Sequence, residues 1–110
     1  MRRIGDLLPA AAAALGIDAE LRRARAAAAW QRIVGERVPA AAGLCHLEAW
    51  DEAAGRLAVA ASQPIVAQEI RLRTSELLEA FGRSMGGRNP EILEVVVRSR
   101  AEGGGSASPP

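Results

Sequence analysis

Alanine and arginine dominate the N-terminal third of the chain, most clearly in the block ELRRARAAAAWQRIVG at residues 20–35. Alanine is the best helix former, so this block is expected to be helical. An alanine side chain buries little apolar area, so the core has to rest on a limited set of Leu, Ile, Val, Phe and Trp residues. The hydrophobic share of 49% in the 110 residues therefore overstates the core that the chain can build.

Two helices are predicted in this region. The first covers residues 4–15 and ends at Gly16, since glycine is a common helix stop. Asp18 is a suitable N-cap for the second, over residues 19–34, and Gly35 ends it.

Trp30 is one of only two tryptophans, and it shares a face of the second helix with Ile33 and Val34. Two roles stay open for it at this point. It docks the alanine helix onto the rest of the fold, or it lies at the edge of the apolar face and anchors a partner protein.

The remaining pattern predicts a small sheet. Residues 44–50 and 56–61 alternate as strands of a hairpin, and EILEVVVRS is a β-branched final strand. Between them, residues 62–82 form one helix that begins near Pro64 and ends at Gly82. The order α-α-β-β-α-β makes an α+β, KH-like fold, because a right-handed β-α-β crossover leaves its two strands parallel. We expect a three-stranded mixed sheet with helices packed on one face, one domain over residues 1–98 and a short disordered tail over 99–110.

Catalytic chemistry is not expected. The single cysteine and single histidine, Cys45 and His46, are neighbours on a strand, so their side chains point to opposite faces and cannot form a nucleophile–base pair or hold one metal ion. The chain contains no phosphate-binding loop and no Cys-x-x-Cys motif. The sequence therefore predicts a non-enzymatic binding protein without cofactor or metal.

Cellular location follows from the same composition. A lone cysteine fits a reducing cytoplasm, and no segment approaches the length of a transmembrane helix, so no membrane association is expected.

Nucleic acid is a second candidate ligand. Three arginines lie within about 80° of one another on the second predicted helix, and two more lie on strands. The candidates are Arg22, Arg25, Arg32, Arg56 and Arg98. A net charge of +1 predicts weak single-stranded DNA binding at most. KH domains clamp RNA with a Gly-x-x-Gly loop, which this chain lacks.

Four motifs together resemble the DciA family of bacterial replication proteins. They are W30-x-x-I33-V34-G35, G55-R56-L57-x-V59, S62-x-P64-I65-V66-A67-Q68-E69-I70 and V95-V96-V97-R98. The resemblance implies a KH-like, non-enzymatic factor that binds the hexameric replicative helicase, assists its loading on single-stranded DNA and contacts DnaA. A stand-alone single-stranded RNA or DNA binding module is the alternative.

The candidate helicase-binding residues are Trp30, Ile33, Ile65 and Leu72. Ile65 and Leu72 lie seven residues apart on the charged side of the long helix. Either the N-terminal helix covers them, or they contact the helicase. We expect the chain itself to be a monomer.

Overall fold

A computed structural model of the chain describes the backbone of residues 4–98 and the side chains of residues 16–98. The tail expected over residues 99–110 lies outside this range. The elements are α1 (Ile4–Arg37), the short 3-10 turn η1 (Pro39–Ala41), β1 (Cys45–Asp51), β2 (Arg56–Ala61), α2 (Pro64–Leu72), α3 (Thr74–Met85) and β3 (Ile92–Val97).

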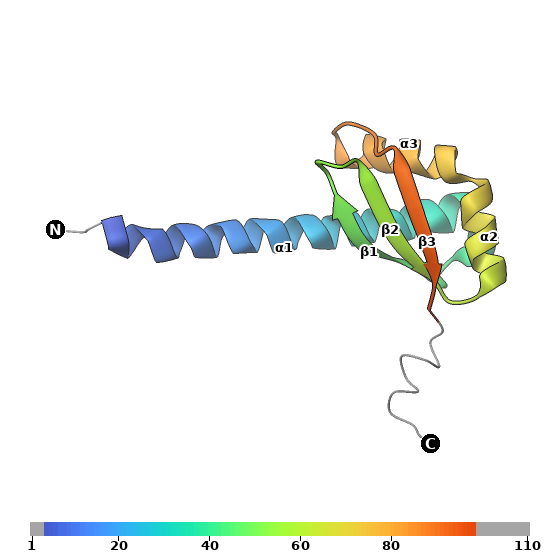
Figure 1. Cartoon of the computed structure of the whole chain (residues 1–110), viewed down its shortest axis with the longest axis horizontal. Helices are drawn as coiled ribbons and strands as arrows, with labels where there is room; N and C mark the ends of the chain where they lie inside the picture. Colours follow the sequence, from blue (N-terminus) through green and yellow to red (C-terminus); the bar gives the residue numbers. More distant parts are fainter. Residues whose placement is uncertain (1–3, 99–110) are drawn as a thin grey trace, which may run out of the picture.

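The three strands form one mixed sheet in the order β1-β2-β3. β1 pairs antiparallel with β2, and β2 pairs parallel with β3. Figure 1 shows the helices on one side of this sheet and the N-terminal half of α1 extending beyond it. The α+β class, the mixed sheet and the parallel crossover are therefore confirmed.

The core lies between the helices and the inner face of the sheet. β2 supplies Leu57 and Val59, and both are fully buried. The largest buried side chains on the helices are Trp30 and Phe81, with Ile70 and Leu77. A core of about this size depends strongly on each large side chain, because the alanines around them contribute little area.

The N-terminal region differs from the prediction, because residues 4–37 form one continuous helix. Gly16 and Gly35 lie inside α1, and neither has a positive φ angle. An internal glycine costs only about 1 kcal/mol relative to alanine. The many alanines around both glycines have the opposite preference, so the helix passes through them and ends only ahead of Pro39.

The helix predicted over residues 62–82 is in fact two helices that meet at Arg73, where φ is −116° and ψ is 26°. The hydroxyl of Thr74 donates a hydrogen bond of 2.8 Å to the carbonyl of Arg71, a local bond that competes with helix continuation. The bend lets α2 pack against β2 and β3 while α3 packs against α1.

Gly82 was also expected to end the helix, but α3 continues past it. A Cβ atom at Gly82 would stand 2.7 Å from the Cα atom of Asn89, so this glycine admits the loop that follows the helix. The helix ends instead at Gly86, whose φ of 79° is the left-handed conformation that glycine favours.

Candidate docking surface

Trp30 and Ile33, two of the four candidate helicase-binding residues, lie inside the core. Trp30 is 0% exposed and Ile33 is 2% exposed. Neither side chain reaches the surface in this structure, so of the two roles left open for Trp30 the structure supports packing. Any effect of these two residues on a partner has to act through the fold.

The side chain of Trp30 also affects the single cysteine, Cys45. Its indole N–H is buried without a full hydrogen-bond partner, and the Cys45 sulfur is a weak acceptor nearby. Burial raises the pKa of the Cys45 thiol, and the indole lowers it by a smaller amount. Cys45 is therefore a core thiol that resists ionisation.

Ile65 and Leu72, the other two candidates, stand on the surface of α2. Their exposed fractions are 61% and 71%. With the exposed Gln68 between them they form one side of the helix, which we name the α2 face. Figure 1 places α2 at the opposite end of the domain from the N-terminus of α1, so α1 does not cover this face.

The inner side of α2 fixes the α2 face in place. Val66 and Ile70 on that side are buried in the core. The exposed pair is therefore carried on a rigid support, unlike an apolar pair on a loop.

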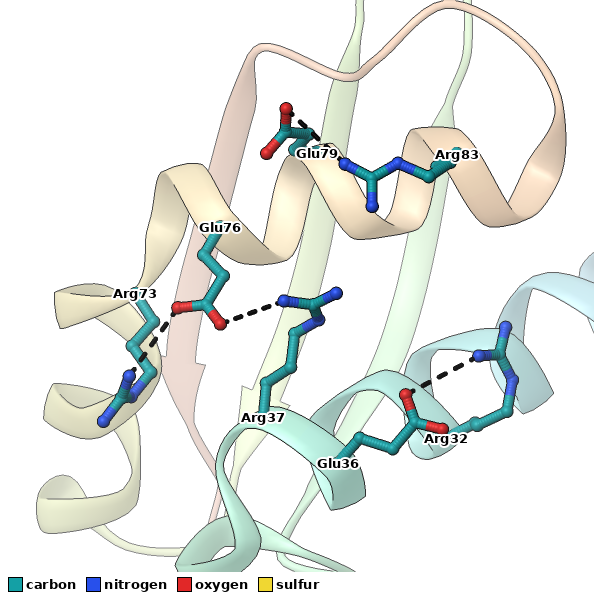
Figure 2. Close-up of polar contacts among 7 residues, drawn as sticks. All are labelled: Arg32, Glu36, Arg37, Arg73, Glu76, Glu79 and Arg83. Carbon is teal, nitrogen blue, oxygen red and sulfur yellow. Dashed lines mark hydrogen bonds and ion pairs between the residues drawn. The ribbon is translucent and has the colours of Figure 1, made fainter.

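Glu76 and Glu79 lie on α3, which the break at Arg73 turns away from α2, whereas Glu69 stays on α2 within one turn of Ile65 and Leu72. Figure 2 shows Glu76 between Arg37 of α1 and Arg73 at the bend, and Glu79 paired with Arg83 along α3. Glu76 accepts from Arg37 at 3.1 Å and lies 3.6 Å from Arg73, and Glu79 lies 3.6 Å from Arg83. The α2 face therefore keeps one carboxylate, Glu69, at its edge.

The candidate nucleic-acid residues do not form one basic stripe. Arg22 forms an ion pair with Glu52 and lies over the ring of Trp50, with 5.3 Å between its Cζ atom and the ring centroid. Arg32 turns the other way, toward α3, where it donates to the Ser84 hydroxyl at 2.6 Å and lies 3.8 Å from Glu36 (Figure 2).

The two strand arginines face carboxylates across the sheet. Arg56 lies 3.2 Å from Glu94. Arg98 reaches Glu48 with bonds of 2.5 and 3.1 Å, and this pairing lowers the pKa of the Glu48 carboxyl. Of the five arginines, Arg25 alone has no ion pair within the part of the chain whose side chains are described.

Trp50 packs on the same side of β1 as Leu47, although residues three apart on a regular strand point to opposite sides. The register shifts between Leu47 and Ala49, and this bulge turns Trp50 toward the helices, opposite Leu57. There its ring meets that of Phe81 edge-on, with centroids 5.1 Å apart and an interplanar angle of 87°. Simple alternation gives no warning of a bulge.

An open groove lies beside Trp50, between α1 and β1. Its volume is about 790 Å³, and its lining includes Arg22, Arg23, Leu47 and Trp50. Both signs of charge line its rim, so its electrostatics favour no single class of small ligand.

No catalytic or metal centre is formed by the side chains that the structure describes. Cys45 is buried while His46 is exposed, and none of these residues make a group of three or more His, Cys, Asp or Glu side chains fit to hold a metal ion. Over the same residues, no helix has the length and apolar character required to cross a membrane. The described residues form a small α+β domain with an exposed apolar pair on α2.

A comparison with family models identifies the family. The model described as "Dna[CI] antecedent, DciA" matches residues 3–95, and the chain therefore belongs to the DciA family. Members of this family are non-enzymatic bacterial loaders of the replicative helicase, and membership implies interaction with the helicase DnaB. No curated protein and no solved structure matched the chain.

Proposed function

We propose that this chain binds the bacterial replicative helicase through the α2 face and assists its loading on single-stranded DNA in the cytoplasm. Family membership supports the choice of partner. The observation that carries the choice of surface is the pair Ile65 and Leu72, which are the two most exposed large apolar side chains of the described residues.

The α2 face has the properties of a small binding hot spot. Hot spots are apolar anchors held rigidly and surrounded by groups that exclude water. Leu72 stands at the C-terminal end of α2, directly before the bend at Arg73, and projects where no other element of the domain packs over it. Ile65 extends the same surface by two turns of helix.

The binding test replaces each anchor by a carboxylate. Leu72→Glu and Ile65→Glu should each weaken helicase binding by about tenfold or more, measured by biolayer interferometry on the purified hexamer. Both side chains are exposed, so the thermal unfolding midpoint should hardly change. Ile92→Glu is the matched control, since Ile92 is 48% exposed on the outer face of the sheet and should leave binding intact.

Two results would contradict the surface assignment: unchanged binding by both α2 variants, or equal loss in the Ile92→Glu control. Loss of the folded state in Leu72→Glu would show instead that Leu72 packs against another part of the chain. The partner itself is tested separately, because failure of the unsubstituted chain to bind the helicase rejects the proposed function.

The loading step has its own measurement. The chain should increase the amount of helicase loaded on a forked DNA substrate, read as the rate of strand separation with ATP. Leu72→Glu should lose this stimulation in proportion to its loss of binding. Normal stimulation by a variant that no longer binds would separate loading from the α2 face.

A further inference from the structure

The N-terminal half of α1 projects from the domain, and its described side chains are exposed. Every residue from 16 to 25 is exposed, and Ala26 is the first buried position of α1 among the side chains that the structure describes. Figure 1 shows this half of α1 standing clear of the sheet and of the other helices. Isolated helices of this length are marginal in water, so an unpartnered projection of this kind gains stability from association.

A row of apolar residues follows the exposed side of α1. Ile17 is 59% exposed and Leu21 is 57% exposed, and Ala24 and Ala28 are exposed in the same row. We name these four residues the α1 stripe. Their spacing of four, three and four residues is that of a coiled-coil interface, and it places the stripe opposite the buried side that carries Trp30.

Two charged residues on one flank of the α1 stripe indicate which molecule binds there. Asp18 and Arg25 are seven residues apart, so they lie on the same flank. Both are exposed, and neither has an ion pair among the side chains that the structure describes. They have opposite signs, so the flank is complementary to itself when a second copy of the helix runs in the reverse direction.

Although the sequence favoured a monomer, we propose that two copies of this chain associate through their α1 stripes, with the two helices antiparallel. The stripe is then self-complementary in size as well as in charge, because Ile17 faces Ala28 of the second copy and Leu21 faces its Ala24. A two-fold axis between the helices generates each of these two contacts twice, as a closed dimer requires.

Charge decides the direction. In the antiparallel arrangement Asp18 of each copy lies about 3 Å along the axis from Arg25 of the other, within reach of the long arginine side chain. In a parallel two-fold arrangement this flank would lie against the opposite flank of the second helix, so Asp18 of one copy would not meet Arg25 of the other. The antiparallel dimer therefore satisfies the two charges that the single chain leaves unpaired.

The remaining length of α1 leaves room for the second helix. Gly35 lies one heptad beyond Ala28, is exposed and has no heavy atom within 4 Å of the position that a Cβ atom would occupy. Gln31, between them, is drawn toward β1, where its Nε2 donates to the carbonyl of Cys45 at 2.8 Å. Four such side-chain contacts make a small interface, so we expect weak association with a Kd on the order of 10 µM.

The test is sedimentation of the full chain across about two decades of concentration around that Kd. A monomer–dimer equilibrium is expected, and Leu21→Glu should abolish it. Asp18→Arg and Arg25→Asp should each weaken association by about five- to tenfold, because each places like charges together twice. Arg23→Asp is the matched control, since Arg23 is exposed but lines the groove beside β1, and it should leave association unchanged.

Mixing the two charge-reversed chains supplies the sharper result. A heterodimer of Asp18→Arg with Arg25→Asp regains opposite charges at both pairs, so the mixture should associate more strongly than either variant alone. A chain that stays monomeric throughout the range overturns the proposal. So does a dimer that the stripe and charge variants leave unchanged, or a mixture no stronger than its components. Helicase binding through the α2 face is a separate measurement and stands or falls independently.

Discussion

Trp30 is the residue on which the packing of α1 depends most. It is fully buried, and the helix around it is rich in alanine, so no neighbouring side chain on α1 can replace its volume. Trp30→Ala should lower the free energy of unfolding by about 3–5 kcal/mol, measured by urea denaturation. Trp50→Ala should cost less, because Trp50 is only half-buried. An unchanged unfolding midpoint for Trp30→Ala would contradict the packing role.

Glu48 gives the domain a pH dependence of predictable sign. Its hydrogen bonds to Arg98 hold the pKa of the folded state below the ordinary value of 4.5. A lowered pKa adds stability at pH values above the unfolded pKa, and this contribution is lost as pH falls through the folded pKa.

Glu48→Gln should therefore reduce stability near neutral pH by less than about 1 kcal/mol, since the pair is largely exposed. The difference between the variant and the unsubstituted chain should be smaller in acid than at neutral pH, in urea denaturation at both pH values. Glu94→Gln, which removes the exposed pair with Arg56, is the control for loss of a carboxylate. An equal difference at both pH values would contradict the assignment.

At the scale of the elements, two glycines inside helices should respond in opposite ways to substitution by alanine. Gly35 is exposed with free space around it, so Gly35→Ala should raise stability by about 0.5–1 kcal/mol through helix propensity. Gly82 lies against Asn89, so Gly82→Ala should lower stability by displacing the loop before β3. Thermal unfolding at low protein concentration measures both. A stabilising Gly82→Ala would show that the loop moves aside without cost.

The sequence predicted the elements better than their boundaries. The strand over residues 56–61 was located correctly because its alternation is regular and a glycine, Gly55, ends the turn before it. The break at Arg73 was missed, because it depends on a hydroxyl bond and on two packing directions that no local pattern records. The stop assigned to Gly16 was wrong because the alanines around it outweigh one glycine.

The candidate binding residues were likewise predicted only in part. Ile65 and Leu72 could be located from their spacing on a helix, and the structure places both on the surface. The arginine stripe could not be judged from sequence, since its partners come from distant segments. Glu52 lies 30 residues from Arg22, and Glu48 lies 50 residues from Arg98.

At the scale of the whole molecule, the charge pattern predicts weak binding to nucleic acid. The net charge is +1, and four of the five candidate arginines already have carboxylate partners in the domain. Phosphates would have to displace those carboxylates, which leaves Arg25 as the group best able to bind one. Single-stranded DNA should therefore bind detectably at low salt and be released near physiological salt.

Fluorescence anisotropy with a labelled oligonucleotide tests this at several salt concentrations. Each phosphate contact contributes about 0.7 to the slope of log K against log salt for single strands. Arg25→Gln should flatten the slope by about that amount. Adding Arg22→Gln and Arg32→Gln should flatten it little further, because both residues are held by glutamates. A decrease of about 2 in the triple variant would show instead that all three arginines contact phosphate. Tight binding that survives physiological salt would favour a nucleic-acid module over a helicase-binding factor, since ion pairs within the domain would then not compete with DNA.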